Sequence, residues 1–130
     1  MRLHRASEGV AYLSVSYDTR LVGDPDTGVM HGGVITALLD TACGTAVMAT
    51  APGHGTKAGK LRATATLDLR IDYMRPATPG QAVVARAECY RLTRAIGFAR
   101  AVAYHERSDE PVASAAGAFI LERARPEGGE

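Results

Sequence analysis

The sequence has no tryptophan, and it holds only five tyrosines and two phenylalanines in 130 residues. A core must therefore be built from Ala, Val, Leu and Ile rather than from aromatic rings. With 46% hydrophobic residues the chain can still bury a substantial core, and its length suits one domain. No internal repeat or long linker divides it. We expect one domain over residues 1–130, with 1–8 and 123–130 frayed.

An excess of charge of either sign is also missing. Fifteen Lys and Arg against 14 Asp and Glu leave a net charge of +1. This balance excludes a disordered polyelectrolyte and a strongly basic nucleic-acid-binding protein. Residues 1–8 contain no apolar segment of the kind found in signal peptides, which predicts a cytoplasmic location. We expect neither a nucleic acid nor a membrane as a partner.

Cysteine and histidine are sparse and scattered. Cys43 and Cys89 match no metal-binding or redox spacing and lie in apolar stretches, so we expect two buried, reduced thiols. The four histidines do not cluster. We therefore predict no metal site and no cofactor.

The hydrophobic pattern predicts one long helix and five strands. The helix is expected at about 33–50, and the strands at 10–17, 66–73, 81–92, 96–106 and 112–122. In the strand 66–73, Leu67, Leu69, Ile71 and Tyr73 alternate with charged residues, which predicts one buried face. Short connections between the later strands predict antiparallel neighbours.

The predicted helix is apolar on nearly every side. Its length resembles a membrane span, but Asp40 within it and several Thr residues favour a buried helix in a soluble domain. Such a helix cannot lie exposed on one side of a sheet. We therefore expect an α+β fold in which an antiparallel sheet, of order β-α-β-β-β-β, wraps around one long central helix, with a further body covering the rest of the helix.

Asp40 is the only formally charged residue between Asp26 and Lys57. An unpaired carboxylate in an apolar setting costs several kcal/mol, which favours a functional role. The helical neighbours one turn away are small and leave a trough for a ligand or another backbone: Thr36, Ala37, Cys43 and Gly44. The alternative is structural, with Asp40 capping a neighbouring element or pairing with an Arg.

His31, Gly32 and Gly33 stand at the expected start of the same helix. Unpaired N–H groups at a helix N-terminus suit a developing oxyanion, and glycines let a carbonyl approach the backbone closely. His31 would add a donor or fix the turn. Alone, the tripeptide is also typical of an ordinary helix start. Its position on the helix that carries Asp40 is what favours a reactive site.

The spacing of these groups has a consequence for assembly. Gly32 and Asp40 are eight residues apart, which is about 12 Å along a helix. A carbonyl carbon attacked by Asp40 therefore cannot place its oxygen on Gly32 of the same chain. If both groups act on one carbonyl, they come from two subunits whose helices pack antiparallel about a two-fold axis. We expect a homodimer with shared active sites and an inactive monomer.

The segment 29–42, which runs from Val29 through His31-Gly32-Gly33 to Asp40 and Ala42, resembles the signature of the PaaI-type hotdog thioesterases. Residues 67–77, followed by Gly80, are similar to the second strand and turn of that family. The resemblance covers nearly the whole chain. It implies the hotdog fold and hydrolysis of an acyl-CoA to a free acid and CoA.

The resemblance also implies roles for single residues. Asp40 would be the nucleophile or general base, Gly32 N–H of the partner subunit the oxyanion donor, and His31 a support for the carbonyl. Gly33 and Thr41 would contact the substrate. The family further implies a dimer with a ten-stranded sheet, often paired into a homotetramer. One departure concerns Pro25, where many relatives carry an Asn that helps to orient the reacting groups. Thr93-Arg94 also replaces a common Gly-Arg or Gly-Lys.

Coenzyme A, as part of the substrate, brings phosphates that need cations. The candidates are Lys57, Lys60, Arg62 and Arg94, although basic residues on loops are often merely solvated.

Two rival functions stay open. One is a non-catalytic acyl-CoA-binding module. The other is a hotdog-fold hydratase or dehydratase, which needs a histidine motif on or near the helix that we do not find. The sequence does not identify the acyl group of the substrate. Small, medium or phenylacetyl-like aromatic acyl groups are all allowed.

Overall fold

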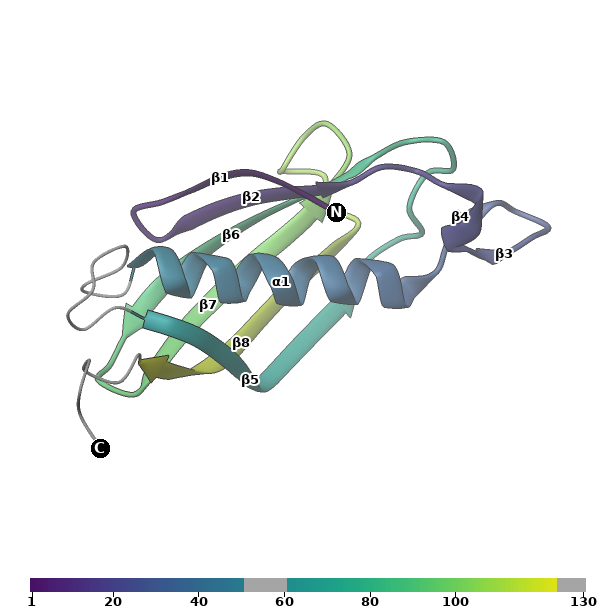
Figure 1. Ribbon diagram of the computed structural model, residues 1–130. Helices are drawn as coiled ribbons and strands as arrows, with labels where there is room; N and C mark the ends of the chain where they lie inside the picture. The colour runs from purple at the N-terminus through teal and green to yellow at the C-terminus, as the bar shows by residue number, and fades with distance from the viewer. Residues whose placement is uncertain (51–60, 124–130) are drawn as a thin grey trace.

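The computed structural model describes residues 1–50 and 61–123, which form a curved antiparallel sheet with one long helix lying across it (Figure 1). The six strands of the sheet are, in spatial order, β1 (Arg2–Ser7), β2 (Val10–Val15), β6 (Val83–Leu92), β7 (Ile96–Tyr104), β8 (Ala113–Arg123) and β5 (Leu61–Tyr73). A 3₁₀ turn (Thr19–Leu21) and a ribbon of β3 (Val22–Asp24) and β4 (Val29–Met30) lead into α1 (Gly32–Thr50). The predicted α+β fold is confirmed.

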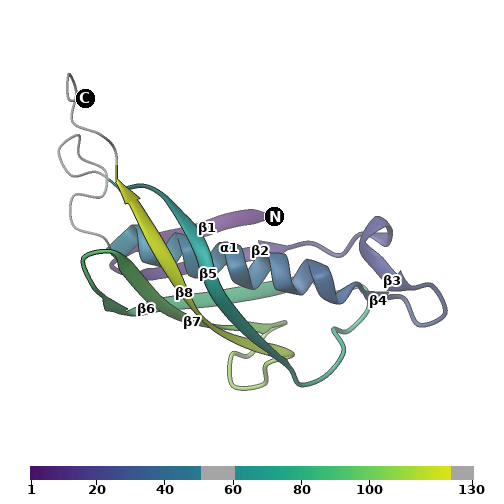
Figure 2. The same ribbon diagram turned by 90° about the horizontal axis from the view of Figure 1, so that it is seen from below.

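One face of α1 packs on the sheet and the other is left open. The buried residues are Ile35, Leu38, Leu39, Ala42, Cys43, Gly44, Ala46 and Val47. Ala37 and Thr41 lie on the open side and are exposed. The sheet of one chain therefore covers the helix on one side only (Figure 2). In the described residues α1 alone has the length and apolar composition of a membrane span, but its apolar residues pack on the sheet.

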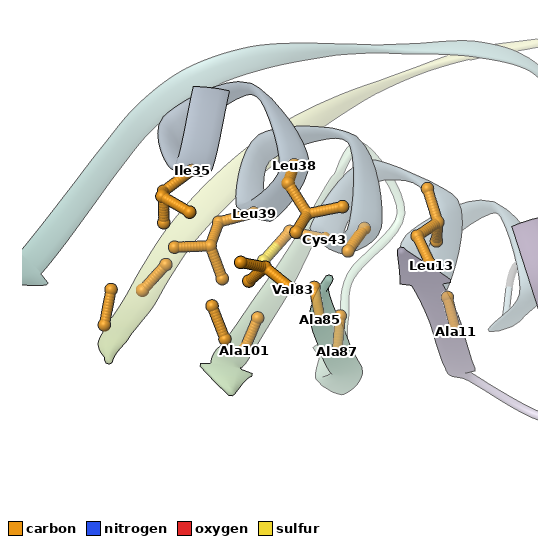
Figure 3. Packing of buried hydrophobic residues seen from close by; sticks show 14 of the residues in the cluster. Ala11, Leu13, Ile35, Leu38, Leu39, Cys43, Val83, Ala85, Ala87 and Ala101 are labelled. Carbon is orange, nitrogen blue, oxygen red and sulfur yellow. The ribbon is translucent and has the colours of Figure 1, made fainter. Parts of the chain in front are cut away.

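Small side chains on the inner face of the sheet allow α1 to approach closely, as Figure 3 shows for Leu38, Leu39 and Cys43 above Ala85 and Ala101. The buried alanines of the strands are Ala11, Ala85, Ala87, Ala99, Ala101, Ala103, Ala113 and Ala115. Phe119 is the largest fully buried side chain in the described residues. A core of Ala, Val, Leu and Ile, predicted from the scarcity of aromatic residues, is confirmed.

The N-terminal segment differs from the expectation. Residues 2–7 do not fray but form β1, which pairs antiparallel with β2 through contacts such as Ala6 opposite Ala11. The main sheet therefore has six strands in the described residues instead of the five that were predicted. In β2, Leu13 and Val15 face the core.

β5 differs from simple alternation because it contains a β-bulge. Thr66 pairs with Phe119 and Asp68 with Ala118, so that Leu67 is an extra residue between two adjacent partners. The bulge places Thr66 on the helix side of the sheet, the same side as Leu69, and leaves Leu67 54% exposed. The predicted buried face of this strand is therefore wrong in part.

β5 is also an edge strand with one free side. It pairs with β8 along 61–73, and no described strand lies on its other side (Figure 1). At 13 residues it is the longest strand of the sheet in the described residues. A long, unpaired edge is a template for pairing with another chain. Leu69 and Ile71 are only half-buried, and Tyr73 at its end is 54% exposed, because no described element covers this side.

Candidate active site

The backbone N–H groups of His31, Gly32 and Gly33 follow one another at the start of α1. Those of His31 and Gly33 already donate hydrogen bonds within the chain. His31 N–H donates to the carbonyl of Leu21, and Gly33 N–H donates to Nδ1 of His31, each at 2.8 Å. Gly32 N–H makes no hydrogen bond within residues 1–50 and 61–123. Gly32 is exposed and lines a cavity. It therefore offers a free donor at the positive end of the helix.

The ring of His31 is packed between two glycines. A Cβ at Gly23 would lie 3.2 Å from ring atom Cδ2, and a Cβ at Gly33 would lie 3.0 Å from Nδ1. Both positions therefore leave little room for a larger side chain. Because Nδ1 accepts the Gly33 hydrogen bond, the neutral ring carries its proton on Nε2. His31 is exposed and presents this N–H next to Gly32.

Asp40 is half-buried at the middle of α1, and its carboxylate is bound by a strand. The hydroxyl of Thr66 on β5 donates to Oδ1 at 2.7 Å. Among the described residues Asp40 has no ion pair, so a structural pairing with an Arg has no counterpart there. Oδ2 accepts no hydrogen bond in the same part of the chain and is left available for chemistry.

A shallow groove of about 240 Å³ opens beside Asp40. It is lined by Asp40, Thr41, Gly44, Thr45, Met48, Thr64, Thr66 and Phe119. Of the small helical neighbours noted in the sequence, Gly44 forms part of this groove, while Cys43 lies on the buried face. Thr41 also lines the groove, and its contact with the substrate stays a prediction.

Cys43 lies one turn from Asp40 and is fully buried. Burial raises the pKa of the Cys43 thiol to about 12, and the negative charge of Asp40 adds to the rise. The thiol therefore stays protonated and takes no part as a nucleophile. Cys43 is a buried free thiol as predicted, whereas Cys89 is free but only partly buried.

A second and larger cavity of about 420 Å³ opens at Gly32. Its walls are mostly apolar: Val29, Met30, Gly32, Ile35, Tyr73, Met74, Arg75, Pro76, Ala77 and Val112. Met74 lines this cavity, whereas Met48 lines the groove at Asp40. Gly32 and Asp40 are separated by eight residues of one helix, about 12 Å. The cavity at Gly32 and the groove at Asp40, called half-sites below, are therefore separate hollows of one chain.

Thr66 is the residue that sequence reasoning missed. Strict alternation placed it opposite the apolar residues of the strand, and only the bulge at Leu67 turns it toward Asp40. Tyr73, at the end of the same strand, was expected only as a core residue. Its hydroxyl instead donates to the carbonyl of Gly32 at 2.9 Å. No signal in the sequence distinguishes these hydroxyls from those of other strand residues.

The proposed phosphate-binding residues are described only in part. Lys57 and Lys60 lie outside the described residues, and the side chain of Arg62 at the start of β5 is not described either. Arg94 is exposed in the turn between β6 and β7. Pro25 is exposed in the turn between β3 and β4.

Comparison with known proteins gives consistent matches. The family model of the thioesterase superfamily matches residues 27–112, which include both half-sites. The chain is 31% identical over 127 residues to the medium/long-chain acyl-CoA thioesterase YigI of Escherichia coli K12, covering 93% of this chain and 81% of YigI.

Solved structures match the fold. A protein of Pseudomonas aeruginosa is 40% identical, with a TM-score of 0.77 over 91% of this chain and 82% of that one. The PaaI protein of Escherichia coli, from the phenylacetic acid degradation operon, has a TM-score of 0.76 at 21% identity, covering 92% of this chain and 78% of PaaI. The second likeness concerns the fold alone.

Proposed function

The chain belongs to the thioesterase superfamily as a PaaI-type hotdog thioesterase and is a thioester hydrolase, and we propose that it hydrolyses acyl-CoA at sites shared between two subunits. In this proposal Asp40 of one subunit acts on a thioester whose oxygen is bound by Gly32 N–H of the other. The substrate is a small or medium acyl-CoA. The name of YigI favours the medium-chain end of that range.

The observation that carries the proposal is the pair of complementary half-sites on one open helix. Gly32 offers a free N–H beside an apolar cavity, and Asp40 offers a carboxylate oxygen beside a groove. Neither half-site is complete, and about 12 Å of helix separates them. Two such helices packed antiparallel bring the Gly32 end of one chain to the Asp40 groove of the other.

The free edges of the chain support the same assembly. The open face of α1 and the unpaired side of β5 lie next to each other along the margin of the sheet (Figure 1). Pairing of β5 with its copy would continue the sheet and cover Leu67. Since the described part of each chain contributes six strands to the main sheet, the continuous sheet would hold twelve strands rather than the ten that the family resemblance implies. A further pairing into tetramers stays a prediction.

The chemistry follows from the groups at the joined site. The thioester oxygen accepts hydrogen bonds from Gly32 N–H and from Nε2–H of His31, which stabilise the charge that develops on it. Asp40 of the partner subunit attacks the carbonyl carbon, or removes a proton from a water that does so. The carbon–sulfur bond breaks, CoA leaves as its thiolate, and water supplies the oxygen of the free acid.

The remaining parts of the proposal concern the rest of the substrate. Arg94, with Lys57, Lys60 and Arg62, would bind the phosphates of CoA. Gly33 would contribute through its position, because its N–H is bound to His31. No metal or cofactor is invoked, and a cytoplasmic location stays a prediction.

The test is release of free thiol from a panel of aliphatic and aromatic acyl-CoAs. Asp40→Asn should abolish hydrolysis while the dimer still forms, because the amide keeps the shape but loses the negative charge. Asp72→Asn is the matched control, since Asp72 is an exposed carboxylate on β5 that faces away from the helix. Its activity should equal that of the wild type. Full activity of Asp40→Asn would reject the mechanism.

A folded dimer that binds CoA thioesters without releasing thiol would favour the acyl-CoA-binding module instead. Hydration of an enoyl-CoA without thiol release would favour a hydratase. In either case the thioesterase proposal would be wrong for this chain.

Mixed dimers test the shared site. Gly32 is the first residue of α1, a position that tolerates proline, so Gly32→Pro removes the N–H with little effect on the helix. Gly32→Ala keeps the N–H, and its Cβ would lie 3.7 Å from the Tyr73 ring, an ordinary contact. Gly32→Pro should lose about 10²–10³-fold in kcat, and Gly32→Ala much less. Mixing inactive Gly32→Pro and Asp40→Asn subunits should restore one of the two sites. An inactive mixture would place both groups in one chain.

A further inference from the structure

Tyr73 reaches from the end of β5 to the first turn of α1. Its hydroxyl donates to the carbonyl of Gly32 at 2.9 Å and also bonds to the hydroxyl of Thr36. The Thr36 hydroxyl in turn lies within hydrogen-bonding distance of the same carbonyl, at 3.2 Å. Tyr73 is 54% exposed and lines the cavity at Gly32. Its hydroxyl is nevertheless held in place by two hydrogen-bond partners, the Gly32 carbonyl and the Thr36 hydroxyl.

The bonded carbonyl belongs to the peptide group that joins Gly32 to Gly33. The N–H of that same group donates to Nδ1 of His31 at 2.8 Å. A donor on the carbonyl side of a peptide strengthens the donor on its N–H side, because hydrogen bonds in a chain polarise one another. The Tyr73 hydroxyl is therefore linked through one peptide group to the ring of His31.

Gly32 and Gly33 have no side chains with which to hold this turn. Among the described residues, Tyr73 is the side chain of the sheet that hydrogen-bonds to it. An oxyanion donor works only if its direction is fixed before the reaction, since reorientation would cost energy during it. The hydrogen bond from Tyr73, called the anchor below, therefore acts on both donors of this half-site, Gly32 N–H and His31 Nε2–H.

We propose, building on the proposed function, that Tyr73 is a positioning residue for thioester hydrolysis. Its hydroxyl holds the Gly32 N–H in the direction of the substrate oxygen. Through the Gly32–Gly33 peptide it also holds His31 in the tautomer that presents Nε2–H. Thr36 completes the anchor by fixing the hydroxyl from the helix side.

The chain offers a matched control for this role. The hydroxyl of Tyr17 donates to the carbonyl of Gly28 at 2.8 Å, a bond of the same kind and nearly the same length. Tyr17 is not among the residues that line the Gly32 cavity or the Asp40 groove. Tyr17→Phe therefore removes an equivalent bond from the loop before α1, and the carbonyl that loses it belongs to Gly28, which lines neither half-site.

The first measurement is steady-state hydrolysis with the best acyl-CoA. Tyr73→Phe should lower kcat about three- to tenfold with little change in KM, the equivalent of one neutral hydrogen bond. Tyr17→Phe should leave kcat as in the wild type. Thr36→Val should repeat the kcat effect, and the double variant should lose less than the product of the two, because both hydroxyls act on one carbonyl.

The second measurement needs no activity. The ¹⁵N shifts of the neutral His31 ring should report a single Nε2–H tautomer in the wild type and in Tyr17→Phe, and a mixture of tautomers in Tyr73→Phe. Unchanged kcat together with an unchanged tautomer in Tyr73→Phe would overturn the proposal. Equal losses in Tyr73→Phe and Tyr17→Phe would reduce Tyr73 to a structural residue. No hydrolysis by the wild type would instead reject the proposed function.

Discussion

At the scale of single residues, the environment of Asp40 is set by the side chains around it. A strand hydroxyl binds one carboxylate oxygen, and a buried thiol lies one turn away. The hydroxyl gives the carboxylate a fixed direction, which a half-buried side chain on an open helix face would otherwise lack. The thiol is kept protonated by burial and by the neighbouring negative charge. Each of these two contacts leads to a measurable expectation.

Replacing Thr66 with Val keeps the shape of the side chain and removes the hydrogen bond to Asp40. A hydrogen bond to a charged group contributes about 1.5–3 kcal/mol, so kcat should fall about 10- to 100-fold. Thr64→Val is the control, because Thr64 lines the same groove. Steady-state kinetics of both variants decide the matter. Equal activity in Thr66→Val and Thr64→Val would show that the hydroxyl does not serve the carboxylate.

The raised pKa of Cys43 predicts a dependence of stability on pH. The folded protein holds the thiol proton more tightly than the unfolded chain, whose thiol titrates near 9.0. The unfolding free energy is therefore unaffected below pH 9 and falls as the pH rises toward the folded value of about 12. Urea titrations should show a steeper fall over this range in the wild type than in Cys43→Ala. Parallel curves would contradict the assignment.

At the scale of elements, the close packing of α1 on the sheet depends on residues without side chains. A Cβ at Gly97 on β7 would lie 2.4 Å from Cγ1 of Val47, which no real contact allows. This position fixes the height of the C-terminal half of the helix above the sheet. The close approach of α1 to the sheet also explains why large side chains are rare on the sheet face that the helix covers.

Gly97→Ala should destabilise the protein by about 1–3 kcal/mol, the usual effect of overpacking a core. Val47→Ala removes the clashing methyl groups and leaves a cavity of its own. The double variant should be more stable than the sum of the two single losses predicts, because the two changes compensate at one contact. Chemical denaturation of the four proteins measures this coupling. Additive losses would mean that α1 has moved away from β7.

At the scale of the whole molecule, the two edges of the sheet differ in the length of their strands and in what lies beside them. β1 forms one edge and the longer β5 the other, next to the open face of α1. Both edges expose a leucine, Leu3 at 55% and Leu67 at 54%. Only the β5 edge adjoins the two half-sites. In the proposed dimer, a partner at that edge would complete the sheet and the active site together.

Leu67→Glu should weaken the dimer and reduce activity at low protein concentration, because a charge would be buried where the two β5 strands meet. Leu3→Glu places the same charge at the opposite edge and should change neither property. Sedimentation velocity and kinetics at several protein concentrations measure both effects. A monomeric wild type with full activity would contradict the shared site altogether.

The sequence by itself determined the helix, the strands of the sheet other than β1, and the two motifs on α1. Apolar periodicity is a local property, and so is the isolation of Asp40 in an apolar segment, which is why both are visible without a structure. The spacing of Gly32 and Asp40 also follows from sequence, since the rise of a helix is constant.

Only the tertiary structure decided which hydroxyls reach the site. Thr66 meets Asp40 across 26 residues, and Tyr73 meets Gly32 across 41. The contact of Thr66 depends on one extra residue in β5, because a shift of one residue turns a side chain to the other face of the sheet. The pairing of residues 2–7 with β2 likewise depends on a partner elsewhere in the chain. Local patterns record which residues favour burial, but partners distant in sequence decide which face and which atom each one meets.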